Sequence, residues 1–164
     1  TNGAIYNFFV KGPLGEIRKS YKVRSLTIEK KNQKVILRTF TRKKKDLIML
    51  NTFKSHIKNM FTGVTKGYVY NLAIVFSHFP INVSVKGKEI LINNLFGERK
   101  PRVAKIIGDT QVEVKGKQII VKGLDKEAVG QTAGNIETAA STTVRDKRIF
   151  QDGIYIVKKA LPME

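Results

Sequence analysis

Two segments with a helical spacing of apolar residues interrupt a chain that otherwise consists of short apolar runs separated by turns rich in glycine and lysine. The first extends from about residue 45 to residue 62. Gly63 is expected to end it, because glycine readily adopts the left-handed conformation found at helix C-termini. The second segment has an apolar face of mostly small residues, formed by Val129, Ala133, Ile136 and Ala140. The pattern predicts many strands and two helices.

The apolar runs around these helices have the composition and the flanking turns of β-strands. Gly12 and Gly15 bracket a turn between the first two runs, and the turns at residues 86–88, 108–109 and 115–117 predict three more hairpins. The expected strands are residues 6–10, 17–21, 25–29, 35–40, 68–76, 82–85, 89–92, 103–107, 111–114, 118–121 and 153–157.

The second half of the chain repeats the order of elements of the first half. An offset of 82 residues places Gly15 and Glu16 over Gly97 and Glu98, and it places the start of the first helix over Glu127. Each half then contains strands, one helix and a closing strand. We interpret this as an internal duplication and expect two domains, residues 1–76 and 77–164.

The chain carries 31 lysines and arginines against 13 acidic residues, a net charge of +18. Such an excess repels itself in a folded protein unless a partner neutralises it, and nucleic-acid phosphate is the partner that it predicts. The alternative is a solvated basic surface. The first 80 residues hold 16 basic and 3 acidic residues, and the remainder hold 15 and 10. The only dense run is residues 42–45, so the charge belongs to folded elements.

Other features limit where such a chain acts. Its longest uncharged apolar stretch, residues 68–79, is too short to cross a bilayer, so no membrane partner is expected. It has no cysteine, and therefore needs no oxidising compartment and cannot form a thiolate metal site. A cytosolic or nuclear setting is expected.

Four ordered blocks resemble one protein family: residues 55–68 (SHIKNMFTGVTKGY), 77–83 (SHFPINV), 94–99 (NLFGER) and 150–155 (FQDGIY). Residues 10–15 (VKGPLG) are similar to the first hairpin of the same family. The family is the universal ribosomal protein L6 family of the large subunit, called L9 in eukaryotes. The closing block favours its eukaryotic or archaeal branch.

The resemblance implies an α+β fold of two similar domains, each an antiparallel sheet with one packed helix. It also implies a structural role in binding large-subunit ribosomal RNA near the translation-factor-binding region, by the sarcin-ricin loop. The C-terminal domain is expected to make the principal RNA contact, beside neighbouring large-subunit proteins. The expected location is the ribosome in the cytoplasm, with nucleolar assembly if the source is eukaryotic.

Basic residues on predicted turns are the best candidates for phosphate contacts, because a turn can direct neighbouring side chains to one ligand. One set surrounds Pro101, another lies between the second helix and the closing strand, and one lysine lies between Gly63 and Gly67. Arginine can also bind a phosphate through two hydrogen bonds. The predicted RNA-binding residues are Lys66, Arg99, Lys100, Arg102, Arg145, Lys147 and Arg148.

Two other functions stay open at this point. A regulatory or architectural protein that binds free RNA or DNA would need exposed aromatic side chains for base stacking, for which Tyr6, Phe8, Tyr68 and Tyr70 are available. An enzyme acting on phosphorylated substrates would need a pocket with a perturbed titrating group. The sequence has no nucleophile-elbow or phosphate-loop motif, and two histidines make a poor zinc site. We expect no enzyme activity, no metal and no cofactor.

Overall fold

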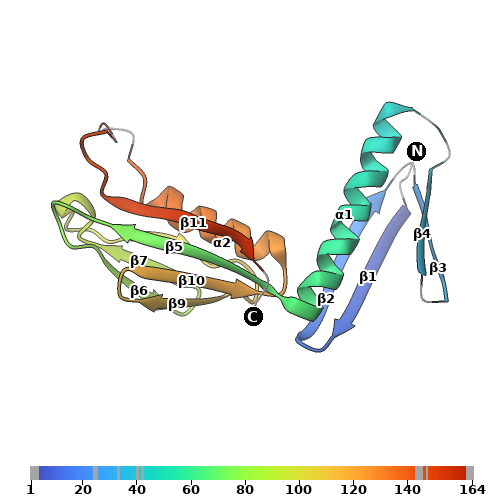
Figure 1. The fold of residues 1–164 in the computed structure, drawn as a ribbon, viewed down its shortest axis with the longest axis horizontal. Helices are drawn as coiled ribbons and strands as arrows, with labels where there is room; N and C mark the ends of the chain where they lie inside the picture. Colours follow the sequence, from blue (N-terminus) through green and yellow to red (C-terminus); the bar gives the residue numbers. More distant parts are fainter. Residues whose placement is uncertain are drawn as a thin grey trace. The chain divides into compact units, whose positions relative to one another are not determined.

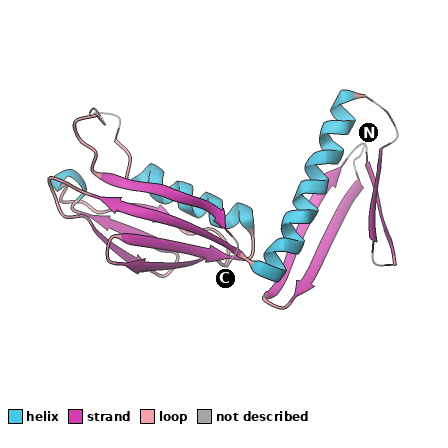
Figure 2. Cartoon of the chain, in the orientation of Figure 1, coloured by secondary structure: helices cyan, strands magenta, loops and turns pink. Residues whose placement is uncertain are grey.

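A computed structural model describes residues 4–23, 26–32, 34–39, 41, 43–142, 146 and 148–161. The chain divides into two compact units, residues 1–65 and 66–164. Each unit contains antiparallel strands and one long helix, so the expected α+β class is confirmed (Figure 2). Among the residues described, no helix combines the length and the apolar character needed to cross a membrane.

The first unit consists of two hairpins and a helix (Figure 1). Strand alternation and helical spacing direct Val23, Leu26 and Phe53 into a shared core, where the ring of Tyr21 meets the ring of Phe53 edge to face. The unit contains β1 (Ala4–Gly12), β2 (Gly15–Val23), β3 (Leu26–Lys31), β4 (Lys34–Thr39) and α1 (Lys44–Lys66).

The first helix does not end at Gly63 as the sequence predicted. It continues to Lys66 and ends at Gly67, whose φ of 65° is the left-handed conformation expected after a helix. The extra turn buries Val64, and the backbone oxygen of Val64 accepts a hydrogen bond of 3.1 Å from the Leu14 amide in the first hairpin turn. This tertiary contact selects the second of two glycine stop signals. It also places Lys66 in the last helical turn rather than in a loop.

Gly12 allows this close approach. A Cβ atom at Gly12 would lie 2.6 Å from the Val64 oxygen and 2.7 Å from the Val64 Cβ, neither of which is a flexible chain end. We expect Gly12→Ala to destabilise the first unit by about 1–3 kcal/mol through overpacking. Thermal denaturation followed by circular dichroism measures this. As a control, Gly134→Ala lies in a helix with open space around it and is expected to be stabilising. Equal melting of the Gly12 variant and wild type would contradict the prediction.

The second unit packs one helix against two antiparallel sheets (Figure 1). The sheets have strand orders β11-β5-β10-β9 and β6-β7-β8, and α2 contacts strands of both. The predicted apolar face of α2 is buried, because its small residues let the helix approach the sheets closely. The elements are β5 (Tyr68–Val75), β6 (Asn82–Lys86), β7 (Glu89–Asn93), the 3-10 helix η1 (Leu95–Gly97), β8 (Arg102–Lys105), β9 (Gln111–Lys115), β10 (Gln118–Gly123), α2 (Lys126–Ala139) and β11 (Gly153–Leu161).

The predicted hairpin at residues 108–109 is wrong. Strand β8 pairs with β7, whereas β9 pairs with β10, so the chain crosses from one sheet to the other at this turn. The amide of Ile106 donates to the Lys88 oxygen (2.9 Å), and the amide of Ile107 donates to the Thr132 hydroxyl (3.0 Å). These contacts to the turn between β6 and β7 and to α2 keep the segment after β8 away from β9.

The division between the units also differs from the predicted boundary at residues 76 and 77. Strand β5, which that boundary assigned to the first domain, pairs with β10 and β11 in the middle of the four-stranded sheet of the second unit. The helices begin at Lys44 and Lys126 and so keep the predicted offset of 82 residues. The strands do not repeat as closely, because the first unit has two two-stranded sheets, whereas the second has a four-stranded and a three-stranded sheet.

Candidate nucleic-acid interface

Several connecting segments meet at one end of the second unit, where β5 and β7 end and β11 begins (Figure 1). Gly153 at the start of β11 pairs with Val75 at the end of β5. The side-chain amide of Asn94 donates to the Pro80 oxygen (3.0 Å), which joins the segments after β7 and β5. We term this region the loop end and define it as residues 76–81, 94–102, 115–117, 140–142 and 148–152.

Asp152 fastens two of these segments together. Its buried carboxylate, 3% exposed, accepts hydrogen bonds from the backbone amides of Ser77 (2.9 Å), His78 (3.3 Å) and Phe79 (3.4 Å), and its Oδ1 lies 3.4 Å from the Nδ1 of His78. Burial alone would raise the pKa of Asp152, but these hydrogen bonds outweigh it and hold the pKa below its ordinary value. An ionised carboxylate therefore joins the residue blocks SHFP and FQDG.

The NLFG block forms a tight left-handed turn around η1. Asn94 (φ 58°), Phe96 (φ 53°) and Gly97 (φ 77°) all have positive φ, which asparagine and glycine tolerate but a bulky residue rarely adopts. Phe96 is buried, and a Cβ atom at Gly97 would lie 3.4 Å from the ring of Phe79. The turn is thus packed against the segment that Asp152 holds.

Arg102 does not project from this loop as the sequence predicted. It is the first residue of β8, and its guanidinium binds both carboxylate oxygens of Glu98 (2.9 and 2.6 Å) and the backbone oxygens of Ala139 (3.1 Å) and Ser141 (2.7 Å). The hydrogen bond to Glu98 raises the pKa of Arg102, while burial opposes the shift and the charge of Glu98 adds to it. Its side chain is only 26% exposed.

Arg99, Lys100 and Arg148 are the predicted residues that the loop end presents to solvent. Arg99 and Lys100 lie between η1 and β8. The side chain of Arg148 is 91% exposed, with its Nε 3.4 Å from the carboxylate of Asp146. Arg145 and Lys147 lie outside the residues that the structure describes. Lys66 is exposed at the end of α1, where its charge complements the helix dipole, and it is not part of the loop end.

Two further lysines lie at the loop end that the sequence pattern did not single out as RNA-binding residues. Lys115 and Lys117 flank the turn between β9 and β10, and the Lys117 oxygen accepts a hydrogen bond of 2.8 Å from the Ile74 amide near the end of β5. The ammonium of Lys117 lies 4.7 Å from the ring centroid of Phe76, and that of Lys115 lies 3.5 Å from Glu113. The turn motif was visible, but its location required knowing that β10 pairs with β5.

Comparison with known proteins supports the resemblance carried by the four sequence blocks. The sequence profile of the family described as "Ribosomal protein L6" matches residues 2–67 and 79–153. The chain belongs to the ribosomal protein L6 family. The "Large ribosomal subunit protein uL6" of Methanothrix thermoacetophila is 49% identical over 150 residues, 92% of this chain and 85% of the relative. The protein of the same name in Archaeoglobus fulgidus is 48% identical over 154 residues, 94% and 79% of the two chains. That of Sulfurisphaera tokodaii is 48% identical over 151 residues, 92% and 81%.

Membership in the L6 family confirms the resemblance seen in the sequence, and these relatives are archaeal. It also confirms that the chain is a ribosomal protein rather than an enzyme. The profile match from residue 79 to residue 153 includes the turn around η1, Arg102, Arg148 and Asp152. Arg102, Glu98 and Asp152 therefore lie in the matched part of the chain, whereas Ser77 and His78, which donate to Asp152, lie just outside it.

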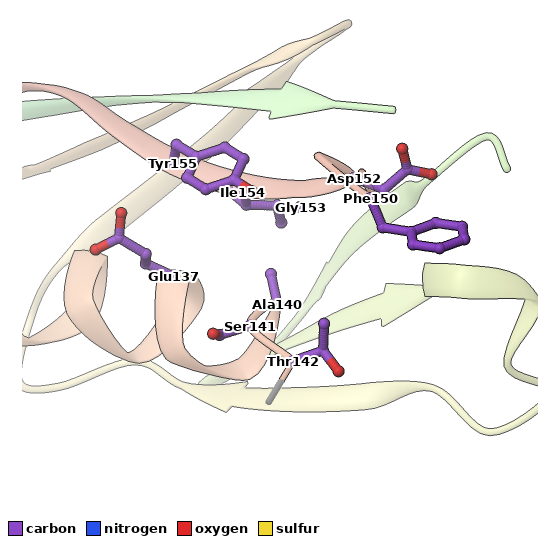
Figure 3. Close-up of a pocket in the computed structure, with 9 residues that line it drawn as sticks. All are labelled: Glu137, Ala140, Ser141, Thr142, Phe150, Asp152, Gly153, Ile154 and Tyr155. Atoms are coloured by element: carbon purple, nitrogen blue, oxygen red, sulfur yellow. The ribbon is translucent and has the colours of Figure 1, made fainter. Parts of the chain in front are cut away.

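A small hollow of about 120 Å³ lies beside the loop end, between the end of α2 and the start of β11 (Figure 3). Glu137 and Tyr155 lie on one side of it, and the carboxylate of Asp152 points away from them. Glu137 accepts a hydrogen bond from the Ile156 amide (3.1 Å), and Tyr155 donates to the Gln151 oxygen (3.1 Å). Glu137 therefore ties α2 to β11, whereas Tyr155 bonds to the segment that leads into its own strand, and both groups have a backbone partner.

The four aromatic residues considered for base stacking pack inward in this L6 protein. Tyr6 donates to the Leu26 oxygen (3.4 Å), and Phe8 contacts the ring of Tyr21. Tyr68 is buried, and Tyr70 packs against the core of the second unit. Tyr68 is thus covered and the other three are half-buried, so none of the four offers a fully exposed ring for base stacking. Among the described residues, no group of three histidine or acidic side chains is close enough to hold a metal ion.

Proposed function

We propose that this chain is a structural constituent of the large ribosomal subunit and that the loop end of its second unit binds ribosomal RNA. Arg99, Lys100 and Arg148 contact RNA phosphates in this proposal. The main support is that these three exposed cations project from segments tied together by Asp152, Asn94 and Arg102. Cations held in place lose little conformational entropy when they bind. Because they contact phosphates, they recognise the shape of the RNA backbone rather than a particular base sequence.

The chemistry of the exposed groups suits phosphate more than base edges. Arginine offers a planar fork that binds two phosphate oxygens, and lysine offers a compact charge. The major groove of an RNA helix is too narrow for side chains to read, so double-stranded RNA is recognised mainly by its shape and backbone. The proposed mechanism is phosphate neutralisation and shape recognition. On sequence grounds, Arg145 and Lys147 belong to the same binding segment as Arg148, and Lys66 is a separate candidate contact.

The proposed position is near the translation-factor-binding region, beside the sarcin-ricin loop and neighbouring large-subunit proteins. The L6 family membership and the names of the archaeal relatives support a large-subunit location. The resemblance of the four sequence blocks supports the finer position. The proposed setting is the ribosome in the cytoplasm, with assembly in the nucleolus if the source is eukaryotic. Cosedimentation with large subunits in rising salt tests the assembly, and free migration at low salt would contradict it.

Single alanine variants test the RNA contact. For Arg99→Ala, Lys100→Ala and Arg148→Ala, the slope of log affinity against log salt is expected to fall in magnitude by about 0.7–0.9. Each variant neutralises one phosphate fewer, so fewer counterions are released when the RNA binds. The measurement is a salt titration of binding to a transcript of large-subunit RNA that contains the sarcin-ricin loop. Lys86→Ala, at the opposite end of β6, is the matched control and should keep the wild-type slope.

The loss should not depend on the base sequence of the RNA, because phosphate contacts carry no sequence information. Melting temperatures should stay close to wild type, since exposed substitutions usually change stability by no more than about 0.5 kcal/mol. Unchanged slopes in all three variants, with normal melting, would overturn the assignment of the interface to these residues. Equal affinity for unrelated RNA or DNA of the same length would favour a general nucleic-acid-binding protein instead.

A further inference from the structure

We propose that Arg102 and Glu98 form a clamp that holds the turn carrying Arg99 and Lys100 in its binding conformation, so that Arg102 serves RNA binding as a positioning residue. This inference rests on the proposed function, because it concerns how the loop end is prepared for RNA. It assigns Arg102 a role different from the phosphate contact that its sequence predicted.

The guanidinium of Arg102 connects three parts of the loop end. Its Nε and Nη2 bind the two carboxylate oxygens of Glu98 at 2.9 and 2.6 Å, a bidentate pair with defined geometry. Its Nη1 donates to the backbone oxygens of Ala139 (3.1 Å) and Ser141 (2.7 Å) at the C-terminus of α2. Carbonyl groups at a helix C-terminus lack partners within the helix, so this cation satisfies them and complements the dipole.

The turn before Glu98 needs such a restraint. Phe96 has a φ of 53°, a strained conformation for a non-glycine residue that persists only where surrounding contacts enforce it. Arg102 supplies two of these contacts, since its guanidinium carbon lies 5.9 Å from the ring centroid of Phe96 and its donors bind Glu98. The Glu98 amide also donates to the Leu95 oxygen (3.0 Å), which closes the turn.

Arg99 and Lys100 are held between the two clamp partners. They follow Glu98 directly and precede Arg102 by only a few residues, so fixing both ends of this segment limits the positions open to both cations. Without the clamp, RNA would have to order the segment as it binds, at a cost in affinity. The clamp also occupies four of the five N–H groups of Arg102, which leaves it no free fork for a phosphate.

Arg102 could contact phosphate or position the turn, and these two roles predict opposite effects of Glu98→Ala on RNA affinity. If Arg102 contacts phosphate, Glu98→Ala frees its guanidinium and removes a repulsive negative charge, so RNA binds more tightly. If the clamp positions the turn, Glu98→Ala weakens binding by about tenfold, because the strained turn relaxes and must be ordered again on binding. The probe is the same large-subunit RNA transcript. We expect weaker binding, and tighter binding would overturn the clamp.

The salt dependence of the Arg102 variants gives a second, independent measurement. Arg102→Ala is expected to lower affinity by about tenfold at every salt concentration with an unchanged slope, since no phosphate contact is lost. Arg102→Lys keeps the charge but not the bidentate fork, so it should not restore affinity. A slope reduced by about 0.7–0.9 in Arg102→Ala, or full rescue by lysine, would overturn the proposal.

Controls separate this inference from the function on which it rests. Glu89→Ala, at the far end of β7, removes the same charge without touching the clamp and should not weaken binding. Glu98→Gln retains an acceptor oxygen and is expected to lie between wild type and Glu98→Ala, which provides a second variant if the alanine change impairs folding. If wild type binds the transcript and Arg99→Ala lowers the slope while Glu98→Ala binds normally, the RNA interface stands and the clamp fails. Absence of salt-dependent binding by wild type would overturn both.

Discussion

Replacing Asp152 with alanine is expected to lower the free energy of unfolding of the second unit by about 3–5 kcal/mol. The substitution removes the acceptor for the backbone amides of Ser77, His78 and Phe79. A buried N–H without a partner costs about 1–3 kcal/mol, and relaxation toward water recovers part of the sum. Urea denaturation followed by circular dichroism measures the change.

Two further substitutions determine whether the loss comes from this hydrogen-bonded network. Asp152→Asn retains one acceptor oxygen and is expected to be less destabilising than Asp152→Ala. Asp109→Ala removes an exposed carboxylate from the same unit and should stay within about 0.5 kcal/mol of wild type. If Asp152→Ala were as stable as the Asp109 variant, the carboxylate would not hold the two segments together.

The pH dependence of the same variants reports on the charge of Asp152. Its pKa in the folded protein lies below its ordinary value, which is about 3.9 in an unfolded chain. The carboxylate therefore stabilises the fold fully above the unfolded pKa, and this contribution is lost as the pH falls through the folded pKa. Wild type should lose stability more steeply than Asp152→Asn as the pH falls below about 4.

The sequence alone predicts the local structure correctly where neighbouring residues determine the backbone conformation. The apolar face of α2 lies at helical spacing after Asp125, whose side chain caps the helix by accepting a hydrogen bond of 3.1 Å from the Glu127 amide. The turns containing Gly87 and Gly116, with φ of 60° and 57°, connect the hairpins that their residues predicted. In each case, the preference of a few adjacent residues agrees with the packing around them.

Local rules failed where contacts between distant residues choose between two allowed structures. Gly63 and Gly67 are both suitable helix stops, and the burial of Val64 against the first hairpin decides between them. The turn at residues 108–109 fits a hairpin, but its flanking strands join different sheets. Strand β5 directly follows α1, yet its hydrogen-bonding partners β10 and β11 come much later in the chain. Such pairings carry no signal in a short window of sequence.

In the candidate site, too, some residues are predictable from local sequence and others depend on contacts between distant residues. Arg99, Lys100 and Arg148 were foreseen as exposed cations because their positions next to turns are local properties. Arg102 looked the same in sequence, but its position on β8 places its guanidinium within reach of Glu98 and the end of α2. The meeting of Asp152 with Ser77 across the sheet was also invisible, because it depends on the pairing of β11 with β5.

Removing Arg99, Lys100 and Arg148 together is expected to reduce RNA affinity on the order of 10²–10³-fold near 0.1 M salt. Each phosphate contact contributes about 0.9 to the magnitude of the salt slope for a duplex, so the loss of three contacts reduces it by about 2.7. Counterion release contributes little to affinity at about 1 M salt, so the variant and wild type are expected to bind about equally there. As the salt falls about tenfold to 0.1 M, the reduced slope produces the stated loss of affinity. The variant combines Arg99→Ala, Lys100→Ala and Arg148→Ala, and the measurement is a salt titration with the large-subunit RNA transcript.

A second triple variant separates local contacts from the overall charge. Lys86→Ala, Lys88→Ala and Lys105→Ala remove the same charge at the opposite end of β6, β7 and β8, where Lys86 and Lys105 flank Glu89. Charges more than a Debye length of about 10 Å from the RNA are largely screened at 0.1 M salt, so this variant should bind nearly as well as wild type. Equal losses in the two triple variants, with both proteins folded, would mean that the RNA responds to total charge. A loss confined to the loop-end variant would require that phosphates meet these three residues.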